Sequence, residues 1–274
     1  MSVEKPGSAI VLCGGRSSRM GRCKAWLPWA GQPMLRHVVE TIQTVTSDVV
    51  VVGAPDQILP EVEAQRIDDP AEGLGPLAGL AVGLSAVSGP LAFVTATDAP
   101  YLTASFISAV LAVGRPAAAR VDGRIQVLSA AYPTDAAEQA QTLLAAGRRR
   151  PLDLLEAVGF QTLTEKEVPD LRSVEGFNTP PQYLEAVRGQ AGDGVTVEFL
   201  GTAQKKVGKS IRVVDPGPLQ RVLAEATGDC SLIKERKVHP AFAVSLEGRE
   251  FVREGAVPIG PGERLIVLDA AVGG

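Results

Sequence analysis

The chain has 274 residues, of which 45% are hydrophobic and 21% charged, as in an ordinary soluble protein of one large domain or two smaller ones. A formal net charge of −4 argues against a general affinity for nucleic acid. The three cysteines, Cys13, Cys23 and Cys230, match no zinc-ligand spacing, and the first eight residues hold no long apolar run. We therefore expect free thiols, no secretory signal and a cytoplasmic location.

The apolar run at residues 9–12 is typical of a buried parallel strand. Gly14 and Gly15 follow it, and glycines allow a sharp turn with accessible backbone N–H groups. Four cations come next within nine residues: Arg16, Arg19, Arg22 and Lys24. Backbone amides and clustered cations bind phosphate oxygens, so this segment predicts a polyphosphate site at the carboxyl end of a strand. A solvated basic loop is the alternative.

The glycine spacing differs from that of two common phosphate-binding loops. A Walker A loop needs Gly-x-x-x-x-Gly-Lys-Ser/Thr, and the dinucleotide fingerprint needs Gly-x-Gly-x-x-Gly. Gly14, Gly15 and Gly21 fit neither pattern, so we exclude both classes.

Helix and strand patterns alternate after this loop. Apolar residues share one helical face in residues 34–45, and residues 49–52 form a second buried strand, an order that makes a right-handed crossover and a parallel sheet. Residues 66–69 are a third strand, which ends in Asp68 and Asp69. Residues 76–87 are a helix of small residues in which Gly79 and Gly83 permit close packing.

No charge occurs in residues 73–97, which raises the question of a membrane span. Pro76 and Pro90 interrupt the segment, so two separate elements fit better than one spanning helix. We expect no membrane association.

Asp98 is the only charged residue between Gly73 and Gly114, and it follows a predicted strand at residues 91–97. A carboxylate among apolar neighbours is costly to bury unless it is paired or bound to a cation. An N-cap is the alternative role, but Thr103 is better placed to cap the next helix. The pattern therefore favours a metal ligand.

The segment 12–24, Leu-Cys-Gly-Gly-Arg-Ser-Ser-Arg-Met-Gly-Arg-Cys-Lys, resembles the signature L-x-G-G-x-S-x-R-M-G-x-x-K of nucleotidyltransferases that have a Rossmann-like sheet. Within that superfamily it most resembles molybdenum cofactor guanylyltransferases. Cys13 stands where Ala is usual and fills the same space. The resemblance implies a nucleotide site that includes Leu12, Cys13, Gly14, Gly15, Lys24, Asp69, Gly79 and Asp98.

Later motifs extend the resemblance. Residues 75–79, Gly-Pro-Leu-Ala-Gly, are similar to a run that lines the family's nucleoside pocket, and residues 97–100 are similar to its x-D-x-P motif, whose Asp binds Mg²⁺. Residues 177–180, Phe-Asn-Thr-Pro, resemble its closing N-T-P motif. The basic corner at residues 147–150 is either a solvated surface or a contact to a phosphate of the second substrate.

The resemblance implies transfer of GMP from GTP to molybdopterin with release of pyrophosphate. Arg19 and Lys24 would neutralise the leaving pyrophosphate, Asp98 would hold Mg²⁺, and Asp69, which fits the family better than Asp68, would contact the nucleoside. No general base is needed, because the attacking phosphate oxygen is already ionised at neutral pH.

One position departs from the family. Where it often has a base-contacting Asn after the second strand, this chain has Gly53. A cytidylyl- or sugar-nucleotide transferase therefore stays open as an alternative.

Residues 189–194, a polar and Gly-rich hexapeptide, are predicted to be a linker between domains at 1–190 and 195–274. Apolar alternation and one helical face in the last eighty residues give the order strand, strand, helix, strand, strand. This is the order of a small α+β fold, the ubiquitin-like β-grasp. The fold class is thus a mostly parallel, Rossmann-like α/β domain followed by a β-grasp domain.

The sequence ends in Gly273-Gly274, a pair that this composition gives by chance about once in a hundred. The strand order and this end together resemble the small subunit of molybdopterin synthase and related sulfur carriers. That resemblance implies a terminal thiocarboxylate, with an adenylating (E1-like) enzyme and the large subunit of molybdopterin synthase as partners. The alternatives are a non-conjugating β-grasp domain, and a sulfur carrier whose N-terminal half is an inactive scaffold.

Overall fold

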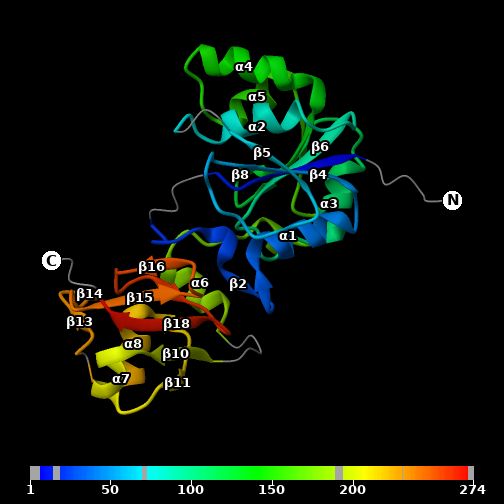
Figure 1. Ribbon diagram of the computed structural model, residues 1–274. Helices are drawn as coiled ribbons and strands as arrows, with labels where there is room; N and C mark the ends of the chain where they lie inside the picture. Colours follow the sequence, from blue (N-terminus) through cyan, green and yellow to red (C-terminus); the bar gives the residue numbers. More distant parts are fainter. Residues whose placement is uncertain (1–6, 15–18, 70–72, 189–193, 230, 271–274) are drawn as a thin grey trace. The chain divides into compact units, whose positions relative to one another are not determined.

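The computed structural model describes residues 7–14, 19–69, 73–188, 194–229 and 231–270 (Figure 1). The chain divides into two compact units: the first comprises Met1–Arg16 and Pro33–Gly176, and the second comprises Ser17–Gln32 and Phe177–Gly274. Three of the four cations after the glycine turn, Arg19, Arg22 and Lys24, thus belong to the same unit as the C-terminal part of the chain. The predicted linker lies outside the described residues, apart from Gly194.

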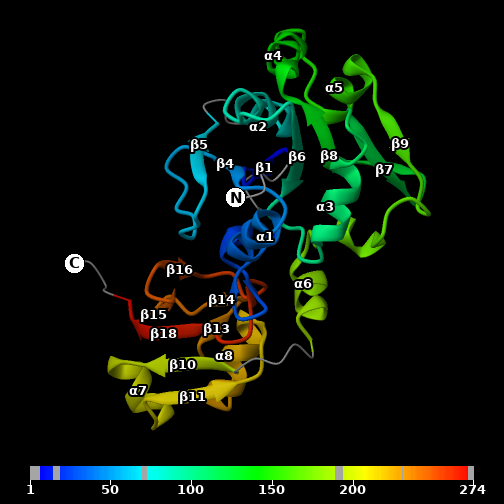
Figure 2. The same ribbon diagram turned by 90° about the vertical axis from the view of Figure 1, so that its right-hand side faces the viewer.

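A seven-stranded sheet forms the centre of the first unit, in the order β5-β4-β1-β6-β8-β7-β9 (Figure 2). The first four strands are parallel, β8 runs antiparallel to both β6 and β7, and β9 is parallel to β7. The prediction of a mostly parallel α/β sheet is therefore confirmed. The strands are β1 (Ser8–Leu12), β4 (Asp48–Gly53), β5 (Gln65–Asp68), β6 (Leu91–Ala96), β7 (Ala117–Val121), β8 (Arg124–Pro133) and β9 (Gln161–Leu163).

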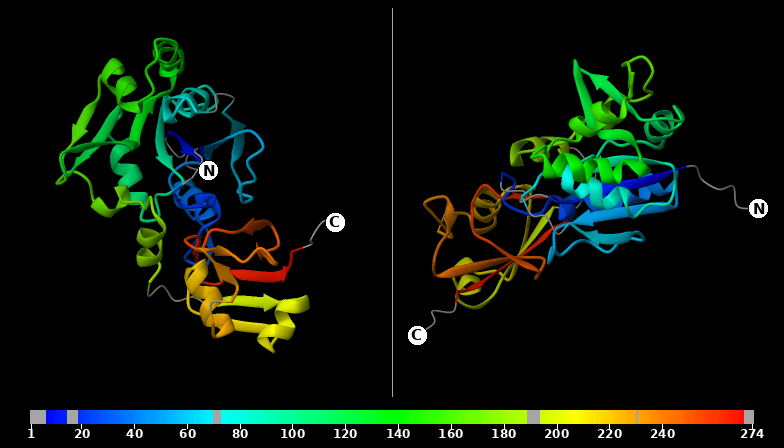
Figure 3. Two further views of the ribbon diagram at one scale, coloured as in Figure 1. Left: turned by 90° about the vertical axis from the view of Figure 1, so that its left-hand side faces the viewer. Right: turned by 90° about the horizontal axis from the view of Figure 1, so that it is seen from above.

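Helices cover both faces of this sheet. In Figure 1, α2, α4 and α5 gather on one side, and α1 and α3 lie on the other. The helices are α1 (Met34–Gln43), α2 (Pro76–Leu84), α3 (Ala104–Leu111), α4 (Ala137–Ala145), α5 (Pro151–Val158) and the 3-10 turns η2 (Thr134–Ala136) and η3 (Leu171–Val174). The two views of Figure 3 show the same arrangement from further sides.

Helix α2 packs unusually closely on the sheet, as its small residues predict. A Cβ atom on Gly83 would lie 2.6 Å from Cγ2 of Ile10, so only glycine fits there without a shift of the strand or the helix. The helix ends at Leu84, three residues earlier than its pattern suggested. At the start of α3, Thr103 caps the helix as expected, because its Oγ1 accepts a hydrogen bond from the N–H of Phe106 at 3.3 Å.

The second unit contains a five-stranded sheet in the order β11-β10-β18-β15-β16 (Figure 2). The first strand along the chain, β10, is parallel to the last, β18, and the other neighbours are antiparallel. Helix α8 buries Leu219, Val222, Leu223 and Ala226 in the core formed with the sheet. Its main elements are β10 (Val195–Phe199), α7 (Gly201–Val207), β11 (Ile211–Val214), α8 (Leu219–Thr227), β15 (Phe242–Leu246), β16 (Glu250–Val252) and β18 (Arg264–Asp269).

Shorter elements complete this unit. They are η1 (Lys24–Trp26), β2 (Pro28–Trp29), β3 (Gln32–Pro33), α6 (Pro180–Ala186), β12 (Gly217–Pro218), β13 (Ile233–Lys234), β14 (Lys237–Val238) and β17 (Pro258–Ile259). Among all the described residues, no helix is long and apolar enough to cross a membrane. The uncharged segment forms two elements, α2 and β6, as expected.

Candidate active site

The carboxyl ends of β5, β4, β1 and β6 lie in register along one edge of the sheet. Leu12 pairs with both Val52 and Ala96, and Gly53 pairs with Asp68. Along the chain, β4 and β5 are added on one side of β1, and β6 is added on the other. Such a reversal of strand order is where open α/β sheets bind ligands. Here Gly14 and Asp98 each follow the strand end by two residues, on the two sides of the reversal.

Thr97 joins these two strand ends. Its N–H donates to the carbonyl oxygen of Leu12 at 3.1 Å, and its Oγ1 lies 3.2 Å from that oxygen and 2.8 Å from Sγ of Cys13. Thr97 and Cys13 are both buried. The threonine therefore fixes the start of the glycine turn against the start of the Asp98 loop. We did not expect this role from the sequence, although a threonine at the end of an apolar strand was its visible signal.

Asp98 is partly buried, and the backbone at Gly176 lies directly against it. A Cβ on Gly176 would clash with the carbonyl oxygen of Asp98 and would lie 3.8 Å from the carboxyl carbon. Glycine at position 176 therefore permits this close approach of the backbone to Asp98.

Asp69 and Asp68 differ in their surroundings. Asp69 follows β5, where its N–H donates to the carbonyl oxygen of Gly53 at 2.7 Å, and its Oδ2 lies 3.5 Å from the Cβ position of Gly79. Asp68 is exposed and forms an ion pair with Arg66 at 3.0 Å. Of the two carboxylates, Asp69 is the one beside the glycine of α2. That same Cβ position lies 3.4 Å from Leu12, so three predicted nucleotide-site residues meet there.

Asp69 and Asp98 are separated by three strand spacings. At about 4.8 Å for each spacing, their backbones are roughly 14 Å apart. Metal–carboxylate distances are about 2.0–2.6 Å, so the two side chains cannot bind the same ion. The site therefore presents two separate acidic positions along its edge.

Gln57 occupies the region beside Gly53, the position where the family often has Asn. Its side-chain amide donates to the carbonyl oxygen of Cys13 at 3.2 Å and accepts from the N–H of Ala54 at 3.0 Å. A Cβ on Gly53 would lie 3.4 Å from Oε1 of Gln57 and 3.1 Å from Leu59. A side-chain amide is therefore present near this strand end, supplied from a loop that carries no motif in the sequence.

Lys24 lies in the second unit, at the start of η1. Its Nζ donates to the carbonyl oxygen of Phe177 at 2.8 Å and to Oδ1 of Asn178 at 3.1 Å. These residues open the Asn-Thr-Pro motif, whose Thr179 begins α6 with a capping box to Gln182. The structure thus brings together the lysine of the signature and the closing motif, whose positions in the sequence differ by 153 and 154 residues. Arg19 is exposed.

Arg22 corrects one expectation. We counted it among the phosphate-neutralising cations, but its side chain is fully buried and forms a two-pronged ion pair with Glu263, with both N–O distances 2.8 Å. A guanidinium held in this way is not available to a phosphate. The sequence could not show this, because Glu263 lies 241 residues further along the chain.

The basic corner at residues 147–150 has a structural role in this structure. Arg148 and Arg150 both pair with Asp153, at 2.5 and 2.7 Å, and Arg149 donates to the carbonyl oxygen of Leu144 at 2.9 Å. Hydrogen bonds from the two arginines hold the pKa of Asp153 well below its usual range. The corner therefore anchors the start of α5.

Some predicted positions lie outside the described residues: Gly15, Arg16, Cys230, Gly273 and Gly274. Within the described part of the chain, no cluster of three or more His, Cys, Asp or Glu side chains could hold a metal ion. Any metal at this site would therefore take most of its ligands from substrate and water, as Mg²⁺ commonly does.

Comparison with known proteins locates the similarity in the first part of the chain. The family model for the MobA-like NTP transferase domain matches residues 9–161. The "Probable molybdenum cofactor guanylyltransferase" of Mycobacterium tuberculosis (strain ATCC 25618 / H37Rv) is 35% identical over 189 residues, covering 65% of this chain and 94% of that protein.

Solved structures share the fold at lower identity. Molybdopterin-guanine dinucleotide biosynthesis protein A from Archaeoglobus fulgidus has 22% identity and a TM-score of 0.53, covering 65% of this chain and 96% of that one. The 2-C-methyl-D-erythritol 4-phosphate cytidylyltransferase from Thermus thermophilus has 17% identity and a TM-score of 0.52, covering 66% and 97%.

Proposed function

Because this chain belongs to the family of MobA-like NTP transferase domains, we propose that this nucleotidyltransferase moves GMP from GTP to the phosphate of molybdopterin and releases pyrophosphate. The observation that carries the proposal is the edge of the first unit's sheet. There the register of β1 with β6 puts Gly14 and Asp98 on the two sides of the strand-order reversal. The relatives named for this activity support the choice of substrates.

Each predicted site residue has a proposed role. The amides at Gly14 and the neighbouring Gly15 hold the triphosphate, and Asp69 contacts the ribose or the base where Gly79 leaves room beside it. Leu12 and Cys13 form the floor under the nucleotide. Arg19 and Lys24, from the same sequence motif as Gly14, neutralise the charge that develops on the leaving pyrophosphate.

Mg²⁺ is the proposed metal, and the residues present fit it. Asp98 offers a hard carboxylate oxygen just after the end of β6, and one or two carboxylates plus substrate phosphates are the usual ligands of Mg²⁺. When bound, the ion supplies charge neutralisation and orientation of the phosphates. Because Asp69 is too far from Asp98 to share an ion with it, we propose Asp98 as the metal ligand and Asp69 as a nucleoside contact.

The attacking group needs no base from the protein. A phosphate monoester loses its second proton near pH ~6, so its oxygen is already a nucleophile at neutral pH. The protein's contribution is then to hold two anionic substrates close together, and its local cations offset their mutual repulsion. Arg148 and Arg150 of the basic corner at residues 147–150 already pair with Asp153. This corner is therefore a weak candidate for a contact to the second substrate.

Nucleotide preference tests the proposal. The full chain is mixed with GTP, CTP, UTP or ATP, each with Mg²⁺, and its thermal unfolding is followed. A ligand at 100 times its dissociation constant stabilises the native state by about 2.7 kcal/mol. Preference for GTP is expected, and its loss in Asp98→Ala would tie binding to the metal site. Preference for CTP would favour the alternative that Gly53 leaves open, a cytidylyltransferase.

We also propose that residues 195–274 form a β-grasp domain that carries sulfur on a terminal thiocarboxylate, alongside a transferase domain at 1–190. The sheet order β11-β10-β18-β15-β16, with β10 parallel to β18 at its centre and α8 on one face, favours this fold. Gly273 and Gly274 would carry the modification. An adenylating (E1-like) enzyme and the large subunit of molybdopterin synthase would then be its partners.

Intact mass tests the sulfur-carrier proposal. The chain is incubated with ATP, a sulfur source and the adenylating enzyme, and a gain of about 16 Da, the difference between one sulfur and one oxygen atom, is expected at the terminal carboxylate. Removal of Gly274 should abolish the gain. A gain that persists would place the modification elsewhere, and no gain in either chain would leave the transferase as the proposed function.

A further inference from the structure

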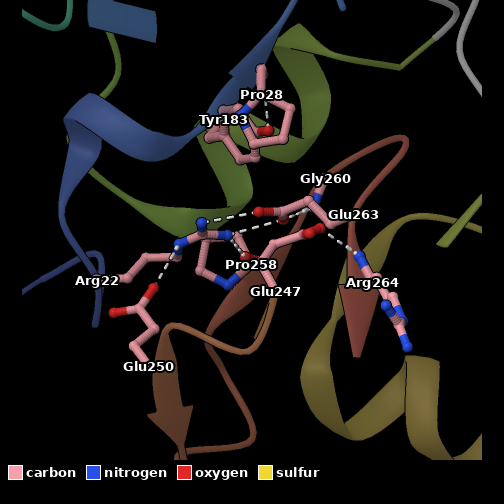
Figure 4. A network of polar contacts seen from close by, with 9 residues as sticks. All are labelled: Arg22, Pro28, Tyr183, Glu247, Glu250, Pro258, Gly260, Glu263 and Arg264. Carbon is pink, nitrogen blue, oxygen red and sulfur yellow. Dashed lines mark hydrogen bonds and ion pairs between the residues drawn. The ribbon is translucent and has the colours of Figure 1, made fainter. Parts of the chain in front are cut away.

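The most deeply buried ion pair described in the second unit links the transferase signature to the C-terminal sheet (Figure 4). Arg22 comes from the signature, and Glu263 comes from the loop between β17 and β18. The exposed fractions of the two side chains are 0% and 4%. Both guanidinium N–H donors reach separate carboxylate oxygens, the geometry that makes such a pair strong and directional.

Further contacts fix both ends of this pair. On the acidic side, Oε2 of Glu263 also accepts the N–H of Gly260 at 2.7 Å. On the basic side, Arg22 donates to the carbonyl oxygen of Pro258 at 3.3 Å and lies 3.7 Å from Glu250. Burial by itself lowers the pKa of Arg22, but the charge of Glu263 and its hydrogen bonds outweigh that effect and raise it. The guanidinium is therefore a permanently charged anchor.

Helix α6 is joined to the same loop. The hydroxyl of Tyr183 donates to the carbonyl oxygen of Pro28 at 2.9 Å, and the same hydroxyl lies so close to Gly260 that no side chain fits at position 260. Residues 22–28 thus have two fixed points, one at Arg22 and one at Pro28. Lys24, which donates to the carbonyl oxygen of Phe177, lies between these two points in the sequence.

We propose that Glu263 is a positioning residue for nucleotide transfer: by holding Arg22 it fixes the segment 19–24, which carries Arg19 and Lys24, the two cations assigned to the pyrophosphate portion of GTP. This inference rests on the proposed function of those two cations. The pair contacts no substrate, since both side chains are buried.

A purely structural role for this ion pair predicts a different result. If Glu263 only stabilised the second unit, its loss would affect all nucleotides alike or none. If Glu263 positions the cations that bind the pyrophosphate portion, its loss weakens the binding of GTP, which has β- and γ-phosphates. The binding of GMP, which has neither of these phosphates, stays unchanged. The difference between the two ligands therefore isolates the positioning effect.

The test compares full-length chains by titration calorimetry with GTP–Mg²⁺ and with GMP. In Glu263→Gln we expect the dissociation constant of GTP to rise at least fivefold and that of GMP to stay within twofold. Glu254→Gln is the matched control, because Glu254 forms an exposed ion pair with Lys237 at 2.8 Å in the same unit. Glu263→Asp keeps the charge and should recover part of the GTP affinity.

A second measurement needs no substitution. Coupling between two sites is reciprocal, so GTP–Mg²⁺ should slow hydrogen exchange at the N–H of Gly260, and GMP should not. The strand residues 242–246 serve as the internal reference.

The outcomes separate the two proposals. Failure of the unmodified chain to bind GTP overturns the proposed function and this inference together. Normal GTP binding by the unmodified chain, with equal effects of Glu263→Gln on GTP and GMP, overturns the inference alone. Unchanged hydrogen exchange at Gly260 when the unmodified chain binds GTP also overturns the inference alone. This measurement remains available if Glu263→Gln does not fold.

Discussion

Two glycines one turn apart in helix α2 provide a test of which residue faces the nucleotide. A Cβ on Gly79 would lie at ordinary contact distance from Leu12 (3.4 Å) and from the Asp69 carboxylate (3.5 Å). A Cβ on Gly83 would lie 2.6 Å from Ile10, well inside contact distance. The same substitution to alanine therefore has opposite consequences at the two positions.

The magnitudes follow from these distances. Replacing a helical glycine with alanine stabilises a protein by about 0.5–1 kcal/mol where the methyl group fits, so Gly79→Ala should raise the free energy of unfolding by that amount. Gly83→Ala gains the same conformational term, but overpacking costs about 1–3 kcal/mol, so its free energy of unfolding should fall by roughly 0–2.5 kcal/mol.

Gly79→Ala should weaken nucleotide binding, although it stabilises the fold. The methyl group of Gly79→Ala occupies space against the Asp69 oxygen that a hydrogen-bonding nucleoside must reach. We expect the dissociation constant of GTP to rise about tenfold, equivalent to about 1.4 kcal/mol, whereas Gly83→Ala should leave it within twofold. Urea unfolding and calorimetric titration measure the two quantities. Unchanged GTP affinity in Gly79→Ala would refute the placement of the nucleoside beside α2.

Two further substitutions test the acidic positions. Asp69→Asn should weaken GTP binding about tenfold by calorimetry, while Asp68→Asn, which removes only the exposed pair with Arg66, should leave it unchanged; equal effects would contradict the distinction between them. The lowered pKa of Asp153 means that its ion pairs stabilise the fold above the usual carboxyl pKa of about 4 and that this stabilisation is lost as pH falls toward the lowered value. Asp153→Asn should therefore lower the urea midpoint at pH 7, and the difference from the unmodified chain should shrink at pH 3; a difference independent of pH would contradict the ion-pair explanation.

The local part of the site could be predicted from the sequence because local chemistry defines it. An apolar strand followed by glycines, and a single carboxylate within about forty otherwise uncharged residues, indicate a strand-end ligand site without any knowledge of distant contacts. The structure then placed Gly14 and Asp98 on the two sides of the strand-order reversal. Their roles in binding stay predictions.

What the sequence did not show depends on contacts between distant segments. Arg22 has the same charge as Arg19 and lies three residues away, and only its contact with the loop before β18 removes it from the set of available cations. Thr97 and Gln57 act through hydrogen bonds to Leu12 and Cys13, which no spacing rule reveals. A side chain that works through a partner in space leaves little pattern in its own neighbourhood.

The C-terminal sheet shows the same limit. Alternation correctly indicated strands at β10, β11, β15 and β18, but the short strand β16 and helix α7 were missed, because runs of three to seven residues carry little periodicity. The alternation of apolar residues also did not show which face of each strand is buried. Ile211 and Val213 are 55% and 66% exposed, although both are apolar.

Transfer of GMP itself tests the central claim most directly. The full chain is incubated with GTP labelled at the α-phosphate, Mg²⁺ and molybdopterin, and the label on the pterin is followed together with released pyrophosphate. We expect equal amounts of labelled product and pyrophosphate, and a rate at least about a hundredfold lower in Asp98→Asn, in line with the loss of about 2.7 kcal/mol of transition-state stabilisation. Transfer that is undiminished in Asp98→Asn, or pyrophosphate release without any label on the pterin, would contradict the proposed reaction.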